Sequence, residues 1–168
     1  MLVAGFLHDL GKVAVPNSIL DKPGKLEPEE FDVIRAHTYY TYQILSTIGG
    51  FEDIVSWASF HHERLDGKGY PFHVSGDELS LGSRIMCVAD VFTAVTENRP
   101  YRQGTPRDET MPILRNLVKS GSLDGSIVGV VEEDYGELDG IRARVQETYL
   151  ASYRKMIAGH PGGNKVRR

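Results

Sequence analysis

One stretch of this chain constrains its fold and chemistry more than any other: residues 61–71, His-His-Glu-Arg-Leu-Asp-Gly-Lys-Gly-Tyr-Pro. Ile54, Val55 and Ala58 precede it at helical spacing, so the pattern predicts that His61 and His62 extend the apolar stripe of a helix. Neutral imidazoles aimed inward from adjacent positions can both reach one metal ion. Two ordinary core or surface histidines are the simpler interpretation of this pair taken alone.

The length and composition of the chain bound its architecture. With 168 residues and 40% hydrophobic content, the chain can bury the core of one domain and hardly of two. We expect this single domain to cover residues 1–158. Residues 159–168 are rich in glycine and basic side chains, which favours a disordered tail.

Charge, cysteine content and hydropathy exclude several classes of protein. A net charge of -4 argues against binding to a nucleic-acid polymer. Cys87 is the only cysteine, so neither an intramolecular disulfide nor a thiolate cluster can form, which fits a cytoplasmic protein. No apolar run approaches the roughly 20 residues of a membrane span, and the apolar start lacks the features of a signal peptide.

Three positions near the start of the chain could also bind metal. An apolar pattern predicts an N-terminal helix that stops at Gly11, with His8 and Asp9 just before its end. Burying this pair is costly unless something binds it, so a metal site and a surface turn are equally good interpretations. His37 lies on the apolar face of a helix that starts at Pro28, where a lone histidine is more often a satisfied core residue.

Asp90 is a further candidate ligand, inside the clearest predicted helix, residues 81–97. Its neighbours are almost wholly apolar, so the buried carboxylate needs a positive partner, which a metal ion would supply. An ion pair with Arg84 or Arg99 is the less favoured alternative.

Arg99 and Arg102 follow that helix, with Tyr101 between them. Two cations one turn apart beside an aromatic ring suit phosphate contact and base stacking. A solvated, charged helix end has the same composition and is common.

The rest of the pattern predicts an all-α fold. Residues 13–26 are irregular, and residues 64–80 contain too much Gly and Pro for a helix, which predicts a loop or a short hairpin. The other expected helices are, in chain order, Pro28 through His37, Ile44 to Gly49, residues 53–63, one opening at Thr105-Pro106, and a long final helix through Ile141, Val145, Tyr149 and Met156.

Taken together, these motifs resemble the HD-GYP family. In chain order they are His8-Asp9-x-Gly11-Lys12, His37, the stretch 61–71 with its Gly69-Tyr70-Pro71 signature, Asp90, and Arg99-Pro100-Tyr101-Arg102. The family comprises bacterial phosphodiesterases of cyclic di-GMP, a branch of the HD metal-dependent phosphohydrolases. The resemblance covers residues 1–104 and implies an all-α HD-domain helical bundle.

The resemblance implies two or three divalent metal ions, usually iron or manganese. Asp9 would bridge two of them. The ligands carried over are those of one site, His8, Asp9 and Asp90, and those of the other, His37, His61 and His62.

The resemblance also implies roles around the metals. Lys12 would meet the substrate phosphate and, with Asp9, form the catalytic pair. Arg99 and Arg102 would hold phosphate. The loop of Gly69, Tyr70 and Pro71 would dock partners such as diguanylate cyclase (GGDEF) domains.

The chemistry of these residues agrees with the implied reaction. Imidazole and carboxylate ligands without thiolate suit Fe, Mn, Zn or Ni. Two metals bridged by a carboxylate would lower the pKa of a shared water, and the resulting hydroxide could attack phosphorus in line with the leaving oxygen. Lys12 and the arginines would offset the developing charge. The expected products are linear pGpG and, after a second cleavage, GMP.

The chain departs from the family pattern in three ways. The family places a further histidine, and in trinuclear members a glutamate, on a helix upstream of His8, and this chain begins too close to His8 for that helix. We therefore expect weaker metal binding at the first site and exposed hydrophobic surface that favours a homodimer. Thr93 replaces an aspartate that can contact the substrate guanine. Thr38 and Thr41 replace Pro and Gly, which should alter the turn after the third ligand.

Three functions are consistent with these features. The preferred one is a metal-dependent phosphodiesterase of cyclic di-GMP. The missing upstream ligand and Thr93 motivate the second, a catalytically impaired module that binds or senses cyclic dinucleotides. The third is an HD phosphohydrolase that acts on another nucleotide or phosphoester.

Overall fold

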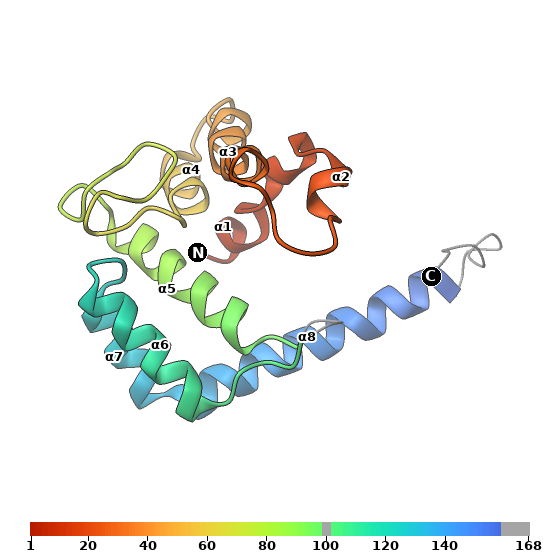
Figure 1. Cartoon of the computed structure of the whole chain (residues 1–168), viewed down its shortest axis with the longest axis vertical. Helices are drawn as coiled ribbons and strands as arrows, with labels where there is room; N and C mark the ends of the chain where they lie inside the picture. The colour runs from red at the N-terminus through yellow and green to blue at the C-terminus, as the bar shows by residue number, and fades with distance from the viewer. Residues whose placement is uncertain (99–101, 159–168) are drawn as a thin grey trace.

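The computed structural model describes residues 1–98 and 102–158, and the elements within these ranges are helices (Figure 1). Their bounds are α1 (Leu2–Leu7), the 3-10 helix η1 (Leu10–Ala14), α2 (Asn17–Leu20), α3 (Pro28–Leu45), α4 (Glu52–Ser59), α5 (Leu81–Thr96), α6 (Arg107–Lys119), α7 (Gly125–Glu133) and α8 (Tyr135–Ala158). The all-α prediction is confirmed. The predictions for Arg99 and for a tail over 159–168 fall outside the described residues, and the extent of the domain stays a prediction.

Two apolar clusters share the central helix α5. The first joins α1, α3, α4 and α5 through Ala4, Leu45, Val55, Ala58 and Met86. The second joins α5, α6, α7 and the start of α8, and it includes Phe92, Met111, Leu114, Val128 and Tyr135. Figure 1 shows α5 between these two groups of helices, while α8 extends away from them. A residue on α5 can therefore face either group.

The start of the chain differs from its prediction. α1 ends at Leu7, and Gly11 lies inside η1 rather than at a helix stop. His8 follows α1 directly, and Asp9 is the residue before η1. The two candidate ligands therefore sit at the joint between two short helices. The short helix α2 also forms within a segment that we expected to be irregular.

α3 is one continuous helix where the sequence predicted two. It begins as expected, with Pro28 in its first turn and a capping box between Glu27 and Glu30. Thr38 and Thr41 lie buried inside this helix. The expectation that they alter a turn after His37 is therefore wrong.

α4 ends at Ser59, so His61 and His62 lie in the turn that follows it rather than on the helix. Residues 64–80 form turns and bends without a strand, so the loop was correctly predicted and the hairpin was not formed. α7 had no counterpart in the predicted elements.

Candidate metal centre

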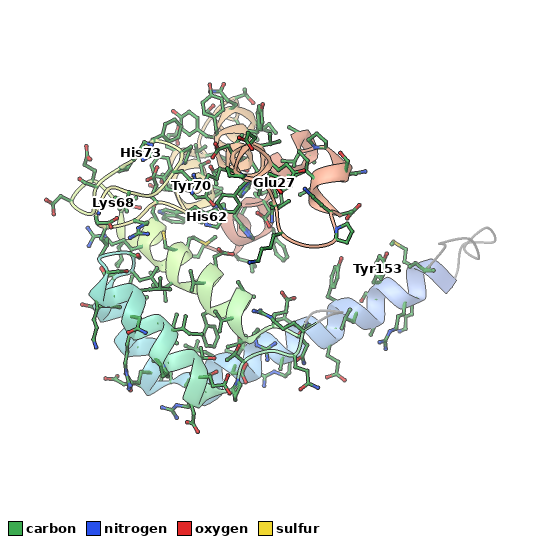
Figure 2. The ribbon with its side chains drawn as sticks, viewed as in Figure 1. Glu27, His62, Lys68, Tyr70, His73 and Tyr153 are labelled. Atoms are coloured by element: carbon green, nitrogen blue, oxygen red, sulfur yellow. The ribbon has the colours of Figure 1, made fainter. Side chains whose placement is uncertain are left out.

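The six side chains predicted as metal ligands converge from four segments. They are His8 and Asp9 between α1 and η1, His37 in α3, His61 and His62 after α4, and Asp90 in α5. In Figure 2, His62 and Tyr70 lie within the body of the molecule, whereas Lys68 and His73 of the same loop lie at its edge. The fold thus brings residues distant in sequence into one cluster.

The Asp9 carboxylate lies at the centre of the cluster. Its Oδ1 is 3.4 Å from His37 Nε2, and its Oδ2 is 3.5 Å from His8 Nε2 and 2.5 Å from Lys12 Nζ. The two oxygens therefore face different histidines, which is the arrangement that a bridging carboxylate needs.

Two sets of three donors offer ligand atoms within 4.8 Å of one another, namely His37 with His61 and His62, and His8 with Asp9 and His61. Asp90 borders both sets, because its carboxylate lies 3.9 Å from His8 Nε2 and 3.8 Å from His62 Nδ1. The two sets share His61.

Backbone carbonyls orient three of the imidazoles. The Nδ1 atoms of His8, His37 and His61 lie 2.7, 2.6 and 2.7 Å from the carbonyl oxygens of Gly5, Ile34 and Ala58. Because a carbonyl only accepts, each Nδ1 carries the proton and each Nε2 of the neutral ring presents a lone pair.

These lone pairs make the donor set fit a cation. His37 Nε2 and His61 Nε2 approach to 3.4 Å, yet neither carries a proton for the other. Two lone pairs aimed at each other in a buried site repel, and a shared divalent ion would turn this repulsion into ligation.

Burial keeps these histidines neutral. It is the largest cause of the lowered pKa of His37, of the pKa of His61 well below its usual value, and of the pKa of about 4 at His62. Burial raises the pKa of Asp9, but Lys12 and then His8 outweigh it, so the net pKa of Asp9 is lowered. Neutral imidazoles and an ionised carboxylate are the forms that bind metal.

A close backbone approach holds the His8-Asp9 joint against α3. A Cβ on Gly11 would overlap the carbonyl oxygen of His37 and would lie 2.7 Å from the Thr41 nitrogen. The Thr41 hydroxyl accepts the Gly11 N–H at 2.9 Å and donates to the His8 carbonyl at 3.0 Å. Gly11 and Thr41 therefore position two candidate ligands although neither belongs to the sets of donors.

The loop after the double histidine is anchored by Glu63. Its buried carboxylate accepts the N–H of Phe72 at 2.7 Å and that of Val74 at 3.1 Å. A Cβ on Gly69 would overlap the backbone of Glu63, so only glycine allows the loop to fold back this closely. This return places Tyr70 over His62, with their ring centroids 4.9 Å apart.

The structure also shows the contacts of Arg84 and Cys87. Arg84, which we considered as an ion-pair partner of Asp90, lies 3.3 Å from Asp124 instead. Cys87 is buried, its thiol donates to the carbonyls of Phe60 and Glu63, and burial raises its pKa to about 12. It therefore carries no thiolate for a metal.

The predicted substrate-binding residues differ in their surroundings. Lys12 reaches the cluster, because its ammonium donates a hydrogen bond to the Asp9 carboxylate. Arg102 is exposed and donates to the Ala94 carbonyl near the end of α5. Thr93 lines an apolar groove between α5, α7 and α8. These roles stay predictions.

Sequence reasoning missed three supporting residues. The sequence analysis treated Thr41 only as a departure from the family pattern, and it treated Glu63 only as part of the motif in residues 61–71. It did not single out Arg35, whose guanidinium lies 5.4 Å from the centre of the Tyr70 ring. The pairing of Gly11 with a hydroxyl on α3 depends on contacts 30 residues apart, which one sequence cannot reveal.

The fold and the donor set define a class: an all-helical domain with a buried histidine–aspartate centre suited to divalent metal ions. The comparison with known families gives this class its name, because the model described as "HD domain" matches residues 1–127. The chain belongs to the HD domain family, and within it to the HD-GYP group that its motifs resemble. Membership of the HD family implies binding of divalent metal.

Three relatives illustrate the similarity. A 3'3'-cGAMP-specific phosphodiesterase 3 of Vibrio cholerae is 49% identical over 66% of this chain and 24% of its own length. The 3'3'-cGAMP-specific phosphodiesterase 1 of the same organism is 41% identical over 78% of the chain and 30% of its length. A cyclic di-GMP phosphodiesterase of Pseudomonas aeruginosa is 44% identical over 61% of the chain and 25% of its length.

The chain therefore spans about a quarter to a third of the length of these relatives. No helix in the described part of the chain is both long and apolar enough to cross a membrane.

Proposed function

We propose that this chain is a metal-dependent phosphodiesterase domain that hydrolyses cyclic di-GMP to linear pGpG and then to GMP. The observation that carries the proposal is the convergence of His8, Asp9, His37, His61, His62 and Asp90. The names of the relatives support the substrate class, since they give 3'3'-cGAMP or cyclic di-GMP as the substrate.

The residues would divide between two ions as the resemblance implies, with Asp9 between the two sites. Imidazole and carboxylate donors suit several divalent metals, and the resemblance to the family favours iron or manganese among them. When bound, the ions would supply Lewis-acid chemistry, which offsets charge at the phosphate and provides a nucleophile near neutral pH.

The chain's own cations would orient the substrate. Lys12 is partly exposed beside Asp9, so its ammonium can leave the carboxylate and meet a phosphate oxygen. Arg102 would bind the second phosphate from the end of α5, and Tyr70 would close the site over His62. The Gly69–Pro71 loop is our proposed docking surface for a diguanylate cyclase domain.

A second candidate substrate is 3'3'-cGAMP. Two relatives, at 49% and 41% identity, carry that specificity in their names, and Thr93 stands where the family commonly has a guanine-contacting aspartate. The catalytically impaired module is the remaining alternative.

One assay separates these functions. The chain is purified without oxygen, its iron and manganese are counted per chain, and the same sample is given cyclic di-GMP or 3'3'-cGAMP. Linear dinucleotide from cyclic di-GMP at the higher kcat/KM supports the proposal. Faster cleavage of 3'3'-cGAMP selects the second candidate, and tight binding without product from a metal-loaded chain rejects catalysis.

A further inference from the structure

An apolar stripe runs along the whole of α8. It repeats every three or four residues, as one face of a helix does, and consists of Leu138, Ile141, Val145, Tyr149, Tyr153 and Met156. From Ile141 onward these side chains are between 43% and 66% exposed. Figure 1 shows the second half of α8 extending away from the other helices, and Tyr153 lies on that part in Figure 2.

The first half of α8 forms one wall of an open apolar groove. The groove has a volume of about 990 Å³, and its other walls are α5 and α7. Leu81 of α5 and Val130 of α7 line it, and they are 66% and 53% exposed. A continuous apolar surface of this kind marks a site of association.

We infer that a second copy of this chain fills the groove, with the two α8 helices packed antiparallel. The stripe matches itself when it is reversed. In that orientation Leu138 meets Met156 of the second copy, Ile141 meets Tyr153, and Val145 meets Tyr149, and all three pairs are centred at the level of Glu147. Each pair joins an aliphatic residue in the first half of the helix to a methionine or a tyrosine in the second.

The charges beside the stripe complement each other in the same register. Glu137 and Lys155 lie on one flank of the helix, and they face each other across the dimer when the helices are antiparallel. Asp139 takes no part in this pairing, because Arg142 of its own chain holds it at 2.7 Å. A parallel arrangement would instead place like charges together.

The projecting half of α8 explains why each copy needs the other. Tyr153 and Met156 extend beyond the groove of their own chain, and α8, at 24 residues, is about 36 Å long. In the antiparallel dimer these two side chains enter the groove of the second copy, and both copies do so at once. The interface is isologous and closes on itself. It rests on α8 and its groove, so it stands or falls independently of the proposed function.

Sedimentation equilibrium of the complete chain tests the dimer. Val145→Glu places a charge in the centre of the interface on both copies, and we expect the dissociation constant to rise about 100-fold. Ala151→Glu, on the opposite face of α8, adds the same charge and should leave the dimer unchanged. Because Val145 is exposed, the variant should fold, and circular dichroism checks this; Tyr153→Glu is the second variant, on the projecting part.

Charge reversal tests the antiparallel register. Glu137→Lys and Lys155→Glu should each weaken the dimer about five-fold, and the double variant should restore it because the reversed charges meet again across the interface. A wild-type chain that stays monomeric overturns the inference, because no second copy then fills the groove. A dimer that survives Val145→Glu, or a double variant that is weaker than both single ones, overturns it as well.

Discussion

His61 is the residue on which the metal centre depends most. It belongs to both sets of converging donors, it is almost fully buried, and its Nδ1–H is fixed on the Ala58 carbonyl. Loss of one imidazole therefore removes a ligand that either ion could use. No other candidate ligand in the described ranges occurs in both sets.

We predict that His61→Asn lowers metal content and reduces phosphodiesterase turnover by more than about 100-fold, since changes even to outer-shell partners of a metal cost 10–100-fold. Metal analysis and a turnover assay on the same sample measure this. His73→Asn is the matched control, because His73 is exposed on the same loop and its φ of 57° suits asparagine. Equal activity of the two variants would contradict a metal role for His61.

Glu63 supports the centre through the loop rather than through the metal. Burial raises the pKa of Glu63, although the N–H groups of Phe72 and Val74 oppose this. In Glu63→Gln, an NH₂ group would face one of these donors. We predict a loss of about 1–3 kcal/mol in the free energy of unfolding and faster hydrogen exchange at both amides.

Urea unfolding and amide exchange measure this effect. Glu78→Gln is the control, because Glu78 is an exposed carboxylate in the same loop that accepts from Ser75. Unchanged protection of the Phe72 and Val74 amides in Glu63→Gln would show that the loop is held by other contacts.

At the scale of elements, the packing of η1 on α3 decides where His8 and Asp9 lie. Gly11 allows that packing, since any side chain there meets the His37 carbonyl. We predict that Gly11→Ala lowers the free energy of unfolding by about 2 kcal/mol or more and weakens metal binding, because the overlap is with rigid backbone.

Gly5→Ala is the control for this substitution. Gly5 lies within α1, and nothing approaches its missing Cβ within 4 Å. Alanine there should be neutral or stabilising by about 0.5–1 kcal/mol. Thermal unfolding and metal titration of both variants decide the matter, and equal behaviour would mean that the joint can shift without cost.

The elements that the sequence predicts well are those with strong local signals. The long apolar run predicted α5, and the apolar stripe through Ile141 predicted α8. Pro28 and the acidic residues that follow it predicted the start of α3. The misses have tertiary causes. α4 ends at Ser59, and His61 turns its Nδ1 back to the Ala58 carbonyl while its Nε2 faces histidines from other segments.

The sequence predicted which residues form the candidate site, but it did not predict how their side chains are arranged. The motifs named all six donors, yet a sequence cannot reveal that Asp9 directs one oxygen at His37 and the other at His8. α7 was missed because its start, Gly125-Ser126, resembles a loop. Its helix is stabilised by the Asp124 cap and by packing on α5 and α6.

At the scale of the whole molecule, α5 connects the metal centre to the groove. Asp90 faces His8 and His62, while Ala89 and Thr93, on an adjacent part of the same helix, line the groove. A second chain docked in the groove would therefore contact the helix that carries a candidate ligand. The two sites share a support, although they use different faces of it.

The stability of the metal-free protein should depend on pH through its buried histidines. His37, His61 and His62 have lowered pKa values in the folded chain, to about 4 for His62. Below the ordinary histidine pKa of about 6.5, the unfolded chain therefore binds more protons than the folded chain. Stability from this source is present above that pKa and is lost as the pH falls toward the folded values.

We predict that the melting temperature of the chelated protein falls between about pH 7.5 and about pH 5.5. Calorimetry in the presence of a chelator measures this. His61→Asn removes one of these buried imidazoles and should make the dependence shallower. The lowered pKa of Asp9 acts in the same direction only in more acidic solution. A melting temperature that is constant or rises on acidification would mean that these imidazoles are not held neutral by burial.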